Sequence, residues 1–280
     1  MNTPEIGTGP WAEAVLRRIA DEPGPQHDIA EAALALAALG QPHADVGRYR
    51  GHLTEIAETV AAEASEDSLE EHVAALNRAL VERLGYRGDD DTYDDLQNAN
   101  LMRVIERRRG MPVTLGILYL HAARSQGWEM VGLNFPRRFL VRLQAGGRRL
   151  IIDPFGGGAT PDAAELRRML KAGGADADQL NPDYYAPVSD RSILLRLQNN
   201  LRYRLIGADR FDEATKVVES MLLFAPDEAE LWRDIALLHA HLGHYDQAVE
   251  AIEHFLPRAG NDRDRHRMAA LKQRLKAKRH

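Results

Sequence analysis

The chain has no cysteine among its 280 residues. This absence excludes disulfide bonds, thiolate metal sites and a cysteine nucleophile, and it is typical of proteins of the reducing cytoplasm. Long apolar runs are missing as well, since the most apolar segment covers only residues 32–40 and is too short to span a bilayer. Residues 1–7 have neither a basic start nor an apolar core, so we expect no secretory signal. The sequence therefore predicts a cytoplasmic protein with no membrane segment.

The charge is uneven along the chain. The formal net charge is −6, yet the segment from Arg258 to His280 holds nine Lys or Arg residues against two Asp residues. A basic tail can bind nucleic acid, but no helix-turn-helix, zinc finger or aromatic-basic strand motif accompanies this one. We interpret the tail as the solvated face of a terminal helix and expect no nucleic-acid partner.

The elements indicated by periodicity give an α+β layout. Helical spacing runs through residues 11–85, with breaks expected at residues 23–25, 40–42 and 65–68. Another helix is expected from about residue 112 to Gly127, followed by strands at residues 130–135, 139–143 and 149–153. Ala145, Gly146 and Gly147 supply the turn between the last two strands. Helices first and an antiparallel sheet afterwards define the α+β class.

Two further segments have local signals. Thr160 and Pro161 predict the start of a helix, with Thr160 as its N-cap. The acidic stretch from Asp89 to Asp95 lacks the central glycine and the closing glutamate of an EF-hand calcium loop. We interpret this stretch as a solvated loop with helix-capping aspartates and expect no metal there.

The last third of the chain contains an internal repeat. Four pairs of similar residues are each separated by 34 positions, namely Leu201 and Ile235, Phe211 and Tyr245, Ala214 and Ala248, and Met221 and Phe255. Thirty-four residues is the tetratricopeptide period, in which each unit is a pair of helices. Two units are too few for a free solenoid, so we expect a capping helix that carries Met268, Leu271 and Leu275.

Three segments in the middle of the chain contain the polar residues of most interest: Gly110–Leu115, Asn134–Arg142 and Ile151–Gly157. Their order resembles that of the transglutaminase-like branch of the papain-like fold, with a nucleophile at a helix start, a base on one strand and an acid on the next. The three positions read Thr114, Arg138 and Asp153 in this chain.

The stretch from Asp95 to Gly158 resembles the bacterial SirB-type regulator family. The resemblance rests on Asp95, Asn98, the run Val104–Gly110 and the strand end at Asp153–Phe155. It implies a transglutaminase-like domain followed by tetratricopeptide repeats, which we place at residues 1–190 and 191–280. Similar proteins carry Ser or Thr where true transglutaminases have Cys, and Gly-His where this chain has Arg137 and Arg138.

The chemistry of these three positions argues against catalysis. An arginine keeps its proton to a pH above about 12, so Arg138 cannot act as a base, and a threonine hydroxyl without a base is a poor nucleophile. His121 lies two helical turns beyond Thr114, about 10.5 Å along a helix axis, and the sequence does not place His72. We expect Thr114 to cap its helix and Asp153 to pair with Arg138.

The leading hypothesis is a non-catalytic interaction or regulatory protein that binds a protein or peptide through the repeat groove. The alternative is an amide hydrolase or acyl transferase with Thr114 as nucleophile. The cleft at Arg138 is either closed by Asp153 or binds an acidic group of the partner. No cofactor is expected, and the cluster His239, His241, His244 and His254 is interpreted as repeat surface and not as a metal site. The sequence does not indicate an oligomeric state.

Overall fold

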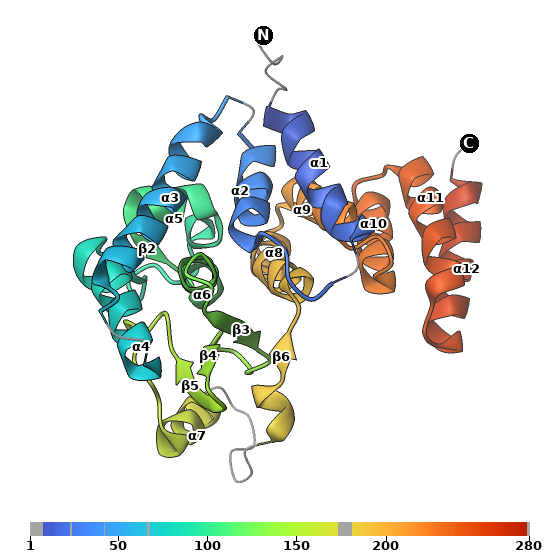
Figure 1. Ribbon diagram of the computed structural model, residues 1–280. Helices are drawn as coiled ribbons and strands as arrows, with labels where there is room; N and C mark the ends of the chain where they lie inside the picture. The colour runs from blue at the N-terminus through green and yellow to red at the C-terminus, as the bar shows by residue number, and fades with distance from the viewer. Residues whose placement is uncertain (1–7, 23, 42, 66–67, 173–180, 279–280) are drawn as a thin grey trace. The chain divides into compact units, whose positions relative to one another are not determined.

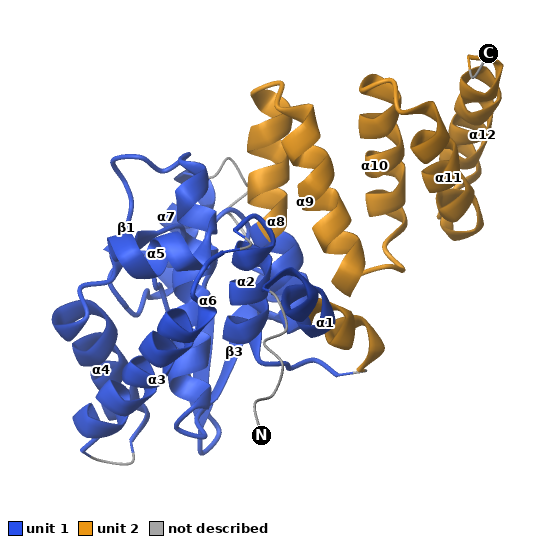
Figure 2. Cartoon of the chain, turned by 90° about the horizontal axis from the view of Figure 1, so that it is seen from above, with its two compact units in different colours: residues 1–15, 24–197 blue, residues 16–23, 198–280 orange. Residues whose placement is uncertain are grey.

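The computed structural model describes residues 8–22, 24–41, 43–65, 68–172 and 181–278. Pro23, Pro42 and Glu66–Asp67, which are parts of the predicted helix breaks, lie outside the described residues. The described residues of the three breaks lie between helices, as predicted. The chain divides into two compact units, shown in different colours in Figure 2. Unit 1 consists of Met1–Val15 with Gly24–Leu197, and unit 2 consists of Leu16–Pro23 with Gln198–His280.

The first part of the chain is helical, as predicted. Its elements are α1 (Thr8–Asp21), α2 (Ile29–Leu39), α3 (Val46–Glu63), α4 (Leu69–Asn77) and the π-helical turn η1 (Arg78–Arg83). Three of these helices begin at a side chain that accepts a hydrogen bond from the backbone of the first turn, namely Asp28, Asp45 and Ser68. Such caps satisfy backbone N–H groups that have no partner inside the helix.

Helix α6 (Pro112–Arg124) is the central element of unit 1 (Figure 1). It contacts α2, α3, α4, β3 and β4, and every residue from Pro112 to Leu120 is buried. The preceding segment contains β1 (Arg87–Gly88), η2 (Leu96–Ala99), α5 (Leu101–Arg107) and β2 (Arg109–Gly110). β1 and β2 pair as a short parallel ladder, which places the start of α6 directly after a fixed strand.

An antiparallel sheet follows α6. Its strands are β3 (Glu129–Leu133), β4 (Val141–Ala145), β5 (Arg148–Ile152) and β6 (Pro187–Val188), in the order β5-β4-β3-β6. Ala145 pairs with Arg148, so the turn is Gly146–Gly147, both with positive φ (56° and 77°). Two residues at positive φ match a tight hairpin turn that glycine adopts without strain. The three predicted strands and this turn are confirmed, whereas the two-residue β6 was not predicted.

Helix α7 (Ala163–Ala172) and the 3-10 turn η3 (Pro182–Tyr185) lie between β5 and β6. The prediction that Thr160 caps this helix is wrong. The Asp162 carboxylate accepts from the Glu165 N–H at 2.8 Å, and the Glu165 carboxylate accepts from the Asp162 N–H at 3.0 Å. These reciprocal bonds form a capping box at Asp162, and a cap two residues earlier cannot reach the same N–H groups.

Unit 2 consists of paired helices. They are the second part of α8 (Asp190–Gly207), α9 (Phe211–Phe224), α10 (Ala229–His241), α11 (Tyr245–Phe255), the turn η4 (Leu256–Arg258) and α12 (Asp262–Ala277). Phe211 and Tyr245 are the first residues of α9 and α11, as the 34-residue period predicts. The expected capping helix is α12, in which Met268 and Leu275 are buried. Unit 1 with its helices and sheet, followed by these repeats, confirms the α+β class.

Candidate functional site

Thr114 lies in the first turn of α6, but it does not cap that helix. The N-cap is Met111, whose side chain forms no capping bond. The Thr114 hydroxyl donates to the Asn98 backbone carbonyl at 2.7 Å, and the residue has no exposed surface. The prediction of a threonine cap is therefore wrong. The Asn98 carbonyl also accepts from the Met111 N–H at 3.3 Å, so the Thr114 hydroxyl is the second donor to this carbonyl, and its own hydrogen bond is satisfied outside its helix.

The Asn98 carbonyl belongs to a hydrogen-bonded loop. The Asn98 side chain donates to the Thr92 carbonyl at 2.7 Å and accepts from Arg107 at 3.0 Å. Arg107 also pairs with Asp89 at 2.9 Å, and Asp89 accepts from both the N–H and the hydroxyl of Thr92. Thr114 therefore anchors the start of α6 to a rigid loop, which is a structural task.

Asp89 corrects the prediction of a fully solvated acidic loop. It is 1% exposed and bonds to Thr92 and Arg107. Burial by itself raises the pKa of Asp89, but hydrogen bonds from Thr92, Asn98 and Arg107 outweigh burial and lower the pKa to about 2. Asp95, by contrast, accepts from the Gln97 N–H at the start of η2, which confirms a capping aspartate in this loop.

The predicted ion pair between Arg138 and Asp153 is present. The Arg138 Nη2 lies 2.8 Å from Oδ2 of Asp153, and its Nε lies 3.1 Å from both carboxylate oxygens. The Arg138 guanidinium also lies over the ring of Phe155, 4.4 Å from the centroid. Asp153 is 2% exposed, while the Arg138 side chain is 29% exposed. The pair therefore closes the space around the acid position and leaves one face of the guanidinium open.

Local backbone geometry aims Arg138 at Asp153. The Arg138 N–H donates to the Pro136 carbonyl at 2.7 Å, and the intervening Arg137 has a φ of 60°. This three-residue turn is a strained arrangement for a residue with a side chain, and glycine adopts it at least cost. On the other side of the pair, a Cβ added to Gly156 would lie 2.7 Å from Oδ2 of Asp153. Any larger residue at position 156 would displace the carboxylate.

The structure does not join the three positions into a triad. Among the described residues, no hydrogen bond or ion pair connects Thr114 to Arg138 or Asp153. The two histidines considered as replacement bases have other contacts. His121 Nε2 lies 3.0 Å from the Leu53 carbonyl, and His72 stacks on Trp128 with ring centroids 3.9 Å apart.

The four histidines of the cluster considered as a metal site do not converge. His241 packs on Phe211, His254 stacks on Trp232, and the rings of His239 and His244 lie 5.8 Å apart. Within the described parts of the chain, no group of three or more His, Asp or Glu residues is arranged to hold a metal ion.

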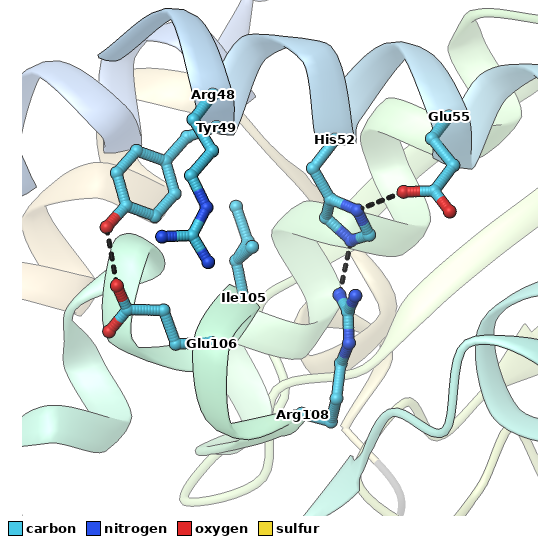
Figure 3. A pocket seen from close by; sticks show the side chains of 7 residues that line it. All are labelled: Arg48, Tyr49, His52, Glu55, Ile105, Glu106 and Arg108. Carbon is cyan, nitrogen blue, oxygen red and sulfur yellow. Dashed lines mark hydrogen bonds and ion pairs between the residues drawn. The ribbon is translucent and has the colours of Figure 1, made fainter. Parts of the chain in front are cut away.

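A cavity between α3 and α5 was not predicted. Its volume is about 300 Å³, and Figure 3 shows the side chains that line it: Arg48, Tyr49, His52, Glu55, Ile105, Glu106 and Arg108. The lining comes from two segments that are 50 residues apart at their nearest positions, Glu55 and Ile105, so spacing alone gave no signal. The one local signal was the run Arg107–Arg109 before Gly110. Three consecutive arginines cannot all interact with the carbonyl groups at the end of one helix.

Comparisons with known proteins divide the chain into a transglutaminase-like part and a repeat part. The transglutaminase-like superfamily model matches residues 47–199, and a tetratricopeptide repeat model matches residues 201–275. A UPF0162 protein from Xylella fastidiosa is 35% identical over 80% of this chain and 81% of its own length. A UPF0162 protein from Vibrio cholerae is 29% identical over 67% of this chain and 70% of its own length. A crystal structure of menin matches with a TM-score of 0.39 and 10% identity, over 92% of this chain and 72% of that chain.

None of the helices in the described ranges is both long and apolar enough to cross a membrane. The superfamily model covers more than half of the 280 residues, and the Xylella relative aligns over most of both chains. The chain therefore belongs to the transglutaminase-like superfamily and to the UPF0162 proteins, with tetratricopeptide repeats after its transglutaminase-like domain.

Proposed function

We propose that this chain is a non-catalytic interaction protein, with a degenerate transglutaminase-like site and a repeat module that binds a protein or peptide. The observation that carries the proposal is the bidentate pair between Arg138 and Asp153. The permanently charged guanidinium of Arg138 is bound to Asp153, the acid that would orient a catalytic histidine. The base position therefore holds no proton acceptor.

The environment of Thr114 supports the same proposal. Its hydroxyl donates to the Asn98 carbonyl, and a backbone carbonyl does not take up a proton at neutral pH. The residue is also fully buried, so a substrate carbonyl reaches the oxygen only if the surrounding chain rearranges. The alternative of a threonine hydrolase or acyl transferase needs both a base and access, and neither is provided by the described contacts of Thr114.

The binding surface we propose is a ladder of apolar side chains on unit 2. Tyr203, Leu237 and Leu271 are 34 residues apart, so they occupy equivalent positions on α8, α10 and α12. Tyr203 is 63% exposed and Leu237 is 42% exposed. Large apolar side chains repeated at one position of successive units form a continuous stripe, which favours a peptide with regularly spaced apolar residues.

Arg202, which forms an ion pair with Asp234, also holds Tyr203, the first residue of this ladder. Arg202 donates to the Asp234 carboxylate at 2.6 Å and to the Tyr203 hydroxyl at 2.8 Å. Arg202 is 3% exposed, so the bond between α8 and α10 is shielded from water. Tyr203 is thereby held in place before a partner arrives, which lowers the entropy lost on binding.

We place the boundary between the transglutaminase-like domain and the repeat module near residue 190, as the sequence predicts. We also place the protein in the cytoplasm, as its lack of cysteine suggests. The resemblance to SirB-type regulators adds a regulatory role to the proposal.

The test is partner capture from a lysate of the source cells, followed by the measured affinity of the captured partner. The double variant Tyr203→Ser with Leu237→Ser should weaken that affinity at least about tenfold, since exposed apolar anchors are lost without disturbing a core. Arg138→Ala is the matched control and should leave affinity and its salt dependence unchanged. Two results together would overturn the proposal and place the binding site at the Arg138 cleft: unchanged affinity in the double variant, and a salt-sensitive loss of affinity in Arg138→Ala.

A further inference from the structure

We propose that the cavity between α3 and α5 binds the phosphoryl group of a small ligand through Arg48 and Arg108. Arg108 is half-buried at the end of α5, and its Nη1 donates to the Tyr86 hydroxyl at 2.6 Å and to His52 Nε2. Both partners are neutral side chains. Among the described residues, no carboxylate lies within the 4.0 Å of an ion pair with Arg108, so its charge is left without an internal anion.

The two arginines next to Arg108 in sequence, by contrast, each form an ion pair with a carboxylate. Arg107 pairs with Asp89 at 2.9 Å, and Arg109 pairs with Asp91 at 2.9 Å. Arg108 lies between them with a left-handed φ of 57°, and this backbone turns its side chain toward α3. Its N–H donates to the Val104 carbonyl, and its carbonyl accepts from the Arg87 N–H. The guanidinium is therefore presented to the cavity from an anchored backbone, and a partly desolvated cation there favours an anion.

His52 is neutral in this arrangement. Its Nδ1 lies 2.5 Å from the Glu55 carboxylate and its Nε2 lies 2.8 Å from the Tyr86 hydroxyl. The proton is therefore on Nδ1, and Nε2 accepts from Tyr86 and Arg108. Burial and then the charge of Arg108 lower the pKa of His52, against the opposing effect of Glu55. The Glu55 carboxylate is thus bound on the far side of the imidazole, while the Arg108 side remains positive.

Arg48 is the second guanidinium that lines the cavity. Glu106 accepts from the Tyr49 hydroxyl at 2.6 Å and from Arg103 at 2.9 Å. These hydrogen bonds, and then the charges of Arg103 and Arg48, lower the pKa of Glu106. Arg48 extends into the cavity from α3, and no described residue forms a hydrogen bond or ion pair with its guanidinium (Figure 3). Two guanidinium groups from two helices match a tetrahedral dianion better than a single planar carboxylate.

The experiment titrates inorganic phosphate into the full chain by calorimetry, with succinate as the carboxylate probe. We expect saturable phosphate binding that Arg108→Gln weakens at least about tenfold, because a charge-assisted pair of hydrogen bonds is lost. Arg48 is exposed, so Arg48→Gln should weaken phosphate binding without any effect on folding. Arg148→Gln, which removes the same charge from β5, is the matched control and should bind as wild type does.

Three results would overturn the proposal: no saturable heat with phosphate in wild type, unchanged affinity in both Arg48→Gln and Arg108→Gln, or tighter binding of succinate than of phosphate. Circular dichroism of each variant separates loss of binding from loss of fold. If Arg108→Gln does not fold, the Arg48→Gln titration decides the outcome alone.

Discussion

The Arg138–Asp153 pair allows a quantitative test of how the former catalytic cleft is closed. Arg138→Met keeps an aliphatic stem over Phe155 and removes the guanidinium, so Asp153 retains one hydrogen bond, from the Phe155 N–H at 3.1 Å. Removal of one partner from a fully buried pair costs about 3–5 kcal/mol, whereas an exposed pair contributes about 0–1 kcal/mol. Asp153 is 2% exposed but the Arg138 side chain is 29% exposed, so we expect an intermediate loss of about 2 kcal/mol.

The pairwise part of this loss is measured by a double-mutant cycle with Asp153→Asn. Each single variant should be destabilised, and the double variant should be less destabilised than the sum of the two, by about 1.5 kcal/mol. The free energy of unfolding is measured by urea unfolding in a background with Trp11→Phe and Trp232→Phe, so that Trp128, which stacks on His72 in unit 1, is the remaining tryptophan. Additivity of the two substitutions within about 0.5 kcal/mol would refute the claim that this pair holds the cleft closed.

Two further predictions concern the surroundings of the site. Gly158 has a φ of 78°, and a Cβ there would lie 1.8 Å from Oδ1 of Asn77, whereas Gly127 has a φ of 74° with open space around it. Gly127→Ala should therefore cost about 1–2 kcal/mol for the left-handed backbone alone, and Gly158→Ala about 3 kcal/mol or more because the bond from Tyr119 to Asn77 is also lost. Equal losses in urea unfolding would contradict this. The pKa of Asp89 is lowered to about 2, so its stabilising effect is present above the unfolded pKa near 4 and is lost as the pH falls toward 2. Asp89→Asn should be less stable than wild type at neutral pH, and this gap should close between about pH 4 and pH 2; a gap independent of pH would be the contrary result.

Local and periodic signals predicted most of the fold. The 34-residue spacing located the starts of α9 and α11, and Gly146–Gly147 located the β4–β5 turn, because both depend on residues close in sequence. The two-residue β6 has no local pattern, since Pro187 and Val188 pair with β3 only after the intervening chain has folded. The cap of α7 was misplaced by two residues because Thr160 and Asp162 are both acceptable caps, and only the position of Glu165 selects between them.

The site was predicted in part. The pairing of Arg138 with Asp153 followed from the resemblance, which places the base and acid positions side by side. Arg138 precedes β4 and Asp153 follows β5, and the pairing of Val141 with Ile152 brings these two strand ends together. The acceptor of the Thr114 hydroxyl was missed, because the Asn98 carbonyl is a backbone group 16 residues away that no side-chain pattern identifies. The cavity at Arg108 was missed for a related reason, since His52 and Arg108 are 56 residues apart and meet only when α3 packs beside α5.

The most direct test of the central claim is an activity measurement across glutaminyl and peptidyl substrates. The 280-residue chain is compared with Thr114→Val, which keeps the shape of the side chain and removes its hydroxyl, and with Arg138→His. We predict no hydrolysis or acyl transfer in wild type above the level of Thr114→Val, and no efficient enzyme from Arg138→His, because the hydroxyl remains bonded to the Asn98 carbonyl. Turnover in wild type that disappears in folded Thr114→Val would contradict the account.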